Sequence, residues 1–188
     1  MQDYVIVVNA SDEELGHEEK LRAHRTPVLH RAFSVFVLDH RGAMLLQRRA
    51  AGKYHSAGLW SNACCGHPRP GESVAAAAER RLLEEMGIQC ALLPAGTVSY
   101  SIDVGDGLRE DEFNHVFVGV FTGDAQPDPA EVCGWQWMVP AALRTVQLDQ
   151  PHALTPWFAL VFDQLQRWLD GDAAAVPAEV RQAWRARP

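Results

Sequence analysis

Residues 66–88 constrain the fold more than any other part of this 188-residue chain. They begin with glycine- and proline-rich sequence, which is typical of a loop. In the following segment, residues 72–86, apolar side chains recur every four positions, which predicts a helix with one apolar face. Gly87 comes directly after that segment and is the residue type that commonly ends a helix. A loop that leads into an amphipathic helix is therefore expected here.

Charged residues on this predicted helix indicate metal or anion chemistry. Arg81 and Glu85 lie four residues apart and therefore share one helix face. Such a face suits Mg²⁺, a hard cation that prefers carboxylate and phosphate oxygens. A solvated ion pair between the two residues is the alternative interpretation.

Predicted strands lie before and after this helix, without the strand–helix–strand rhythm of a parallel sheet. We expect strands at residues 4–8, 32–38, 43–47, 88–93, 98–102, 113–121 and 135–139. Residues 11–24 are expected to form a turn and an irregular or short helical segment, and residues 50–58 a loop. A helical turn at 140–144 and an amphipathic helix at 156–169 follow. This pattern predicts an α+β fold.

Composition argues against several classes of protein. Lys and Arg number 17 and Asp and Glu 24, so the net charge of −7 argues against nucleic acid as the main partner. No apolar run approaches ~18 residues, so we expect no membrane span. The first residues resemble no signal peptide. The four cysteines, at positions 64, 65, 90 and 133, lack the spacing of a zinc ribbon or disulfide framework, so a reducing, cytoplasmic location is expected.

Residues 66–88 also resemble the Nudix box, which reads G-x5-E-x7-R-E-U-x-E-E-x-G-U, with U apolar. The matching positions are Gly66, Glu72, Arg80, Leu82, Glu84, Glu85, Gly87 and Ile88. Arg81 is the one departure, because it stands where the box has its first helix glutamate. The resemblance implies a Nudix-type α/β/α sandwich with a mixed β-sheet, in a superfamily that mostly hydrolyses diphosphates.

Further segments are similar to one divergent branch of that superfamily, the type I isopentenyl diphosphate isomerases. They are LHRAFSVF at 29–36, WSNACCGHP at 60–68, EDE at 110–112 and LTPW at 154–157, within a resemblance that runs from about residue 5 to residue 168. It implies one Nudix-like catalytic domain, residues 1–170. The Ala-rich tail, residues 171–188, lies outside it and is expected to form a short, weakly attached helix.

The resemblance implies one divalent metal, Zn²⁺, Mn²⁺ or Mg²⁺, held by three histidines and two carboxylates. The matching residues are His24, His30, His67, Glu110 and Glu112. Glu110 and Glu112 are two residues apart, so on a strand both point the same way, and imidazole with carboxylate suits these metals. His17 competes with His24, because the family's first metal histidine lies at a variable distance from the next motif. The remaining histidines, at 40, 55, 115 and 152, are expected at the surface or in loops.

Catalytic roles are implied for three residues, Cys65, Glu112 and Tyr100. The reaction converts isopentenyl diphosphate to dimethylallyl diphosphate, adding a proton at one carbon and removing one from a neighbour, so it needs two groups of opposite protonation state. The order in which Cys65 and Glu112 act is left open. The family favours proton delivery from the side of Glu112 and Tyr100.

Substrate contacts are implied for a further set of residues. The diphosphate would be bound by Lys20, Arg49, Lys53 and Arg81, and by a Mg²⁺ ion held at Glu85. Trp157 and Trp60 are expected to wall a dry pocket, where an aromatic face stabilises a carbocation. A cation at position 81 favours holding a diphosphate over cutting it.

Two other functions remain as alternatives. One is a Nudix hydrolase of a nucleotide or prenyl diphosphate, which Glu84 and Glu85 keep open. The other is a non-enzymatic domain that senses diphosphates, which would need neither Cys65 nor Tyr100. The expected partner is a small prenyl diphosphate, and the expected state is a monomer or small homo-oligomer.

Overall fold

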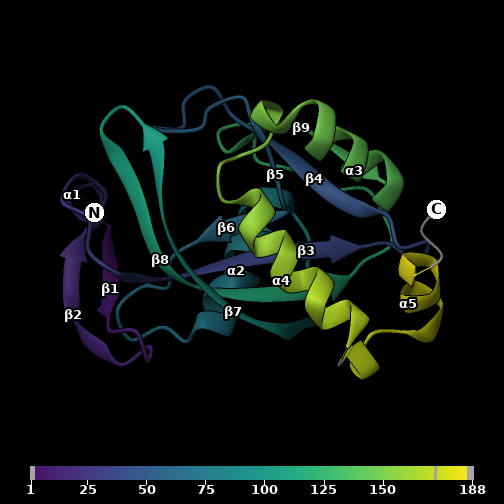
Figure 1. The fold of residues 1–188 in the computed structure, drawn as a ribbon, viewed down its shortest axis with the longest axis horizontal. Helices are drawn as coiled ribbons and strands as arrows, with labels where there is room; N and C mark the ends of the chain where they lie inside the picture. Colours follow the sequence, from purple (N-terminus) through teal and green to yellow (C-terminus); the bar gives the residue numbers. More distant parts are fainter. Residues whose placement is uncertain (1–2, 172, 186–188) are drawn as a thin grey trace.

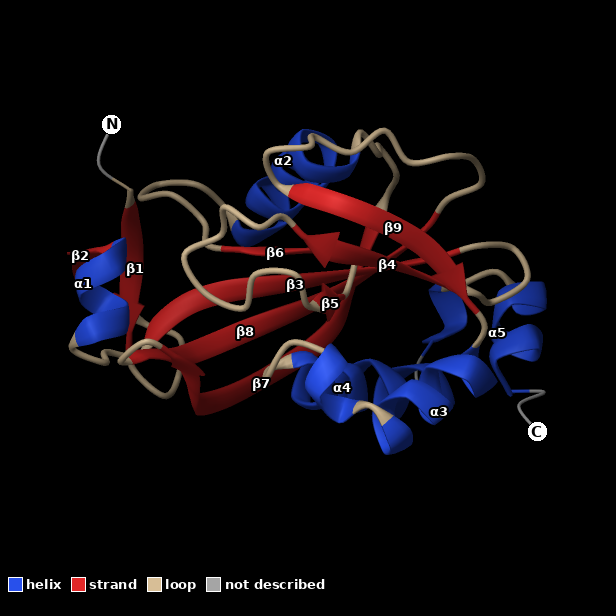
Figure 2. Ribbon diagram, turned by 90° about the horizontal axis from the view of Figure 1, so that it is seen from above, coloured by secondary structure: helices blue, strands red, loops and turns tan. Residues whose placement is uncertain are grey.

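Helices cover both faces of one sheet in the computed structural model, which describes residues 3–171 and 173–185 (Figure 1; Figure 2). Its strands are β1 (Tyr4–Val8), β2 (Glu14–Glu19), β3 (His30–Leu38), β4 (Met44–Arg49), β5 (Trp60–Ser61), β6 (Cys64–Gly66), β7 (Leu92–Gly105), β8 (Leu108–Val120) and β9 (Val132–Met138). Its helices are α1 (Lys20–Arg25), α2 (Val74–Met86), α3 (Pro140–Asp149), α4 (Phe158–Asp170) and α5 (Ala178–Arg185), with short 3₁₀ turns at Pro151–Ala153 and Ala173–Ala175.

Strand β3 lies at the centre of the sheet and makes it a mixed one. It pairs in parallel with β8 along its whole length and antiparallel with β1, β4 and β6. The long hairpin of β7 and β8 extends the sheet on one side, and β9 pairs with β4 on the other. The predicted α+β class and mixed sheet are therefore confirmed.

The two faces of the sheet carry separate hydrophobic cores. Helix α2 covers one face, where Ala78 and Leu82 pack against Val35 of β3. Helix α4 covers the other, where Phe158 and Phe162 complete a larger cluster. Figure 2 shows α2 on one side of the strands and α3, α4 and α5 on the other, which is the three-layer sandwich that the Nudix resemblance implies.

The predicted helix at residues 72–86 is confirmed as α2, and the residues at its two ends explain where it begins and ends. The Ser73 hydroxyl accepts a hydrogen bond from the backbone N–H of Ala76, which caps the first turn. At the other end Gly87 adopts φ +66° and its N–H bonds the carbonyl of Leu83. A Cβ at Gly87 would lie 2.6 Å from the backbone oxygen of Gln126, so glycine is required by space as well as by conformation.

Two strand predictions differ from the structure. The expected strand at 88–93 is mostly wrong, because β7 begins only at Leu92 and Ile88 is instead buried against α2. Strand β2 lies within residues 11–24, where we expected a turn and an irregular or short helical segment. Its polar sequence, ELGHEE, has no alternation of apolar residues. It lies at the edge of the sheet and pairs only with β1 among the described strands, so it needs no buried face.

The C-terminal helix is attached more firmly than its sequence suggests. Val180 and Trp184 of α5 are buried, and the Trp184 ring packs edge-on against Phe162 at 5.9 Å. Residues 172 and 186–188 of the predicted tail lie outside the described residues. Within the described ranges, no helix combines the length and the apolar character that crossing a bilayer requires.

Candidate active site

The pairing of neighbouring strands brings the predicted site residues together. His30 of β3 lies beside Glu112 of β8, and Tyr100 of β7 lies opposite that same glutamate. Cys65 of β6 pairs with Ser34, farther along β3. Residues that are far apart in the sequence thus meet on the face of the sheet that α4 covers.

A cavity of about 830 Å³ opens at this place. Most of the predicted site residues line it: Lys20, Arg49, Lys53, Cys65, His67, Arg81, Glu85, Tyr100, Glu110, Glu112 and Trp157. His24 and His30 are fully buried behind the lining. Trp60 does not line the cavity. Its ring packs against the α4-side core, and its backbone forms a bridge to Leu154, so the expected wall role does not fit its position.

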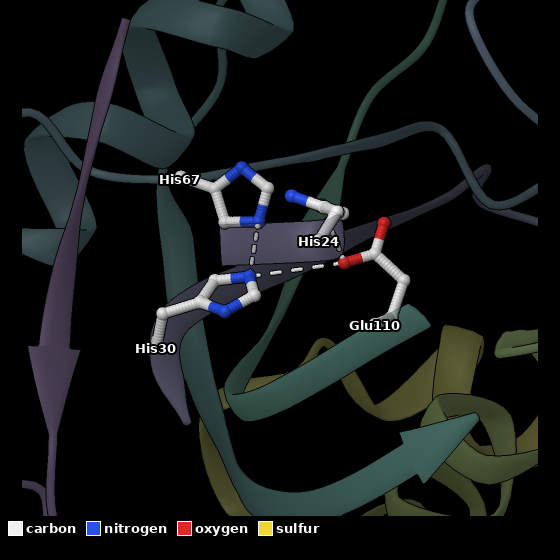
Figure 3. A group of neighbouring side chains, drawn as sticks. All are labelled: His24, His30, His67 and Glu110. Carbon is white, nitrogen blue, oxygen red and sulfur yellow. Dashed lines mark hydrogen bonds and ion pairs between the residues drawn. The ribbon is translucent and has the colours of Figure 1, made fainter. Parts of the chain in front are cut away.

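Three histidines and one carboxylate converge on a single point, as Figure 3 shows. The ligand atoms of His24, His30, His67 and Glu110 all lie within 4.8 Å of one another. His24 Nε2 is 2.8 Å from Glu110 Oε2, and the Nε2 atoms of His30 and His67 are 3.2 Å apart. Glu112 faces the group with one oxygen, since its Oε1 lies 3.1 Å from His67 Nε2.

The arrangement of these rings fits a divalent metal. His24 Nδ1 lies 2.6 Å from the carbonyl oxygen of Lys20, and His30 Nδ1 lies 2.8 Å from that of Val28. A carbonyl only accepts, so each Nδ1 carries the proton and each Nε2 presents a lone pair to the centre, the orientation that metal-binding histidines take. Glu110 Oε2 is buried and lies 2.8 Å from His24 Nε2, but with the proton of His24 on Nδ1 no hydrogen bond to this oxygen remains among the described residues. Several lone pairs therefore face one another in a buried site. A bound cation would coordinate them and remove their mutual repulsion.

A hydrogen-bonded group at the wall of the cavity contains Glu112 and Tyr100. The Tyr100 hydroxyl donates a short hydrogen bond to Glu112 Oε2, and the Asn114 amide donates to the same oxygen at 2.9 Å. Burial, and then the negative charge of Glu110, raise the pKa of the Glu112 carboxyl well above its usual range. Burial likewise raises the pKa of the Tyr100 phenol. Both groups are thus biased toward their protonated forms.

The adjacent cysteines point to opposite faces of the sheet. Cys64 is fully buried in the core under α2, whereas Cys65 lines the cavity. The Cys65 thiol donates to Asn62 Oδ1 at 3.1 Å and lies 3.6 Å from the Ser34 hydroxyl. Burial raises the pKa of Cys65 to about 11, so the group is a neutral thiol at pH 7. Strand alternation therefore places one cysteine in the core and its neighbour at the cavity.

Cations occupy the end of the cavity beside helix α2. Arg81 Nη2 lies 2.5 Å from Glu85 Oε1 and 3.0 Å from Glu131 Oε1. The second oxygen of Glu85 accepts a hydrogen bond from the side chain of Gln47 at 2.9 Å. Arg81 and Glu85 lie on one helix face and form an ion pair, as in the alternative interpretation, but the pair is not solvated, because the Glu85 carboxylate is buried and lines the cavity.

Arg49 and Trp157 form a second contact within the cavity lining. The Arg49 guanidinium lies over the Trp157 ring, 5.3 Å from its centre, which is cation–π geometry. Arg49 Nε and Trp157 Nε1 are buried donors without an acceptor among the described residues. Both side chains also line the cavity.

His55 was expected in a surface or loop position, and the structure corrects this. Its backbone lies in the loop, but its side chain is buried, with Nε2 3.1 Å from Glu110 Oε1 and the ring packed edge-on against Trp157. It therefore links a predicted metal ligand to the substrate pocket. His17, the competitor of His24, instead lies on the exposed β2 strand next to Glu14.

Other contributors were missed, and for all of them except Asn62 and Asn114 the reason is that their partners are more than thirty residues away in the sequence. Asn62 and Ser34 contact the Cys65 thiol, Gln47 contacts Glu85, and Glu131 bridges two cations. Asn114 carried a usable signal, since it lies two residues after Glu112 and so shares its strand face.

Comparison with known proteins shows which families this chain is similar to. The sequence profile of the NUDIX domain family matches residues 28–165. An isopentenyl-diphosphate Delta-isomerase of Burkholderia multivorans is 46% identical over 173 residues, which is 89% of this chain and 98% of the relative. A Streptomyces griseus protein of the same name is 52% identical over 163 residues, with 84% of this chain and 80% of the relative covered.

Solved structures show the same fold at low sequence identity. DR0079 from Deinococcus radiodurans superposes with a TM-score of 0.71 at 18% identity, covering 86% of this chain and 98% of that one. A MutT protein from Methanosarcina mazei gives 0.60 at 22% identity, covering 74% and 94%. These similarities concern the fold alone.

Proposed function

This chain belongs to the isopentenyl-diphosphate Delta-isomerase family of NUDIX-domain proteins, and we propose that it moves the substrate's double bond by proton transfers at Glu112, Tyr100 and Cys65. Isomerisation adds one proton to the terminal methylene carbon of isopentenyl diphosphate and removes one from the carbon two bonds away. The net proton count is unchanged. The reaction therefore needs a donor and an acceptor beside the same short hydrocarbon.

The observation that carries this proposal is that one cavity contains both kinds of group. Cys65 lines it, the hydrogen-bonded pair of Tyr100 and Glu112 lines it as well, and basic side chains stand at its ends. A substrate anchored by its charged end would place its hydrocarbon between proton-transfer groups. A hydrolase needs no thiol in that place.

The hydrogen bond between Tyr100 and Glu112 supports delivery from their side of the cavity. The Tyr100 hydroxyl donates to Glu112 Oε2, so a proton can pass between the phenol and the carboxyl. Cys65 would take the other proton as its thiolate, which is the minor form of this group at pH 7 because burial raises the pKa of the thiol to about 11. Trp157, buried and against Arg49, would shield that cation with its ring.

Metals complete the proposal through residues already described. His24, His30, His67, Glu110 and Glu112 would hold one divalent ion, Zn²⁺, Mn²⁺ or Mg²⁺, whose charge would stabilise the carboxylates around it. Glu85 would hold a Mg²⁺ ion together with the substrate diphosphate, because Mg²⁺ commonly takes one or two carboxylates and completes its shell with phosphates and water. Lys20, Arg49, Lys53 and Arg81 would bind the diphosphate itself.

Arg81 also argues against diphosphate hydrolysis. Of the two adjacent Nudix-box glutamates, Glu85 lines the cavity, whereas Glu84 is half-exposed outside the lining and pairs with Arg80 and Arg81. A cation thus stands where a hydrolase would gather metal ions around an attacking water. The site is suited to holding a diphosphate intact.

One incubation separates the two functions. The protein is given isopentenyl diphosphate and divalent metal, and dimethylallyl diphosphate and free phosphate are both measured. We expect the isomer without phosphate release; phosphate without isomer would refute the proposal.

A matched pair of variants then tests the role of Cys65. Cys65→Ala should abolish isomerisation, whereas Cys64→Ala, one residue away but facing the other core, should largely preserve it. Equal losses of activity at equal thermal stability would contradict the assignment of Cys65.

A further inference from the structure

The cations at the α2 end of the cavity already have a shared anionic partner. Glu131 lies directly before β9, and its two carboxylate oxygens are divided between Lys53 and Arg81. Oε2 pairs with Lys53 Nζ, and Oε1 lies 3.0 Å from Arg81 Nη2. All three side chains line the cavity. Glu131 therefore spans two cations in the way that one phosphate group would.

The local charges show why a diphosphate cannot simply be added. Lys53 and Arg81 contribute two positive charges, and the two carboxylates that line the cavity beside them, Glu85 and Glu131, contribute two negative ones within contact distance. An anion arriving here meets cations that are already neutralised. A phosphate that bridges Lys53 and Arg81 needs the position that the Glu131 carboxylate occupies between them, so it competes with this carboxylate.

Glu131 is held over the cations by its own backbone. Its N–H donates to the carbonyl of Asp128 at 3.0 Å, and its carbonyl accepts from the N–H of Ala50 at 2.9 Å. The second bond ties it to the 50–58 loop, which also carries Lys53. The Glu131 side chain is nevertheless 25% exposed, and Arg81 and Lys53 are 23% and 19% exposed, so a ligand from solvent can reach all three.

Protonation does not release this carboxylate. Burial alone would raise its pKa, but hydrogen bonds from Lys53 and Arg81 outweigh that effect and lower the pKa of Glu131 to about 2. The group is ionised at any physiological pH. Only a competing anion, or a cation that draws Glu131 away, can free Lys53 and Arg81.

We propose that Glu131 is an exchangeable counter-ion that bridges Lys53 and Arg81 in the free protein and gives way to a phosphate group of the ligand. This deepens the proposed function, on which it rests for the identity of the ligand. The exchange makes the site selective, because a weakly charged ligand gains too little from the two cations to displace a carboxylate that bridges both. Glu131 would act as a specificity residue and not as a catalytic one.

Inorganic pyrophosphate is the probe, since it carries the diphosphate but cannot be isomerised. Its binding is measured by titration calorimetry at one ionic strength, with and without Mg²⁺, for wild type and Glu131→Gln. Without Mg²⁺ we expect the variant to bind about tenfold more tightly, because the competing charge is gone while the size of the side chain is kept. With Mg²⁺ the variant should bind no more weakly than wild type.

Glu84→Gln is the matched control, since Glu84 also contacts Arg81 but lies outside the cavity lining and makes no contact with Lys53 among the described interactions. It removes the same charge and should leave pyrophosphate affinity nearly unchanged. An equal gain in the control would show a general charge effect and overturn the proposal. So would weaker binding by Glu131→Gln, and a loss confined to the Mg²⁺ arm would show instead that Glu131 binds the metal.

The outcome is independent of catalysis. If the protein fails to isomerise isopentenyl diphosphate but Glu131→Gln still gains pyrophosphate affinity, the exchange stands and the proposed reaction falls. If isomerisation is found and the gain is absent, the exchange falls alone.

Discussion

Replacing Gly87 by alanine should destabilise the protein through a specific backbone contact. Gly87 has φ +66°, a conformation that costs an L-residue about 1–2 kcal/mol. An added Cβ would also lie 2.6 Å from the backbone oxygen of Gln126 and 3.0 Å from its Cβ. Overpacking of this kind typically costs about 1–3 kcal/mol. The expected loss of unfolding free energy is therefore about 2–5 kcal/mol.

The segment that would have to move is anchored to the same helix, so it cannot yield freely. The N–H of Gln126 donates to the carbonyl of Met86 at 2.9 Å, and the N–H of Asp128 donates to that of Glu85 at 3.0 Å. Relief of the contact at Gly87 would stretch bonds at the C-terminal end of α2. For a chain of this length, about 2–4 °C of melting temperature corresponds to each kcal/mol, so the melting temperature should fall by about 4–20 °C.

Gly71→Ala is the matched control. Gly71 has φ +78°, but a Cβ there would meet nothing within 4 Å. It shares the conformational cost and the change in unfolded-chain entropy, so the difference between the two variants isolates the contact with Gln126. Thermal unfolding followed by circular dichroism, together with urea titration, measures both. Equal losses within about 0.5 kcal/mol would refute the reasoning, because the steric term alone is expected to exceed that difference.

Two further predictions concern the chemistry of the site. Tyr100→Phe removes the hydroxyl that donates to Glu112. This variant should lower kcat by about 10²–10⁴-fold with little change in melting temperature. A kcat within threefold of wild type would exclude Tyr100 from proton transfer. His55→Gln removes the partner 3.1 Å from Glu110 Oε1 and should weaken metal affinity by about 10–100-fold in a competition with a chelator. His40→Gln, at an exposed turn, should leave that affinity unchanged, and an equal effect in both variants would show that His55 does not support the metal site.

The central helix and the candidate ligands could be predicted from sequence because their signals are local or of fixed spacing. The four-residue apolar repeat and Gly87 define α2, and the two-residue spacing of Glu110 and Glu112 places both on one strand face. The strand expected at 88–93 failed, because burial of Ile88 under α2 produces the same apolar pattern as pairing in a sheet.

The roles of single histidines and cysteines were decided by tertiary structure. The sequence around His55 and around His17 gives no sign of which histidine is buried. The fold buries His55 against Glu110 and leaves His17 on an edge strand. Cys64 and Cys65 are chemically identical neighbours, and only the pairing of β6 with β3 determines which faces the cavity. Such differences depend on which residues lie opposite in space.

The sequence by itself determined the fold class, the helix at its centre and the family, since periodicity, capping and motif spacing are written along the chain. The tertiary structure decided which charges meet. Glu131 stands fifty residues from Arg81 and seventy-eight from Lys53, and no local pattern relates the three. Their contact arises because the start of β9 returns beside the 50–58 loop, and Coulomb interaction depends on distance in space and not on separation in sequence.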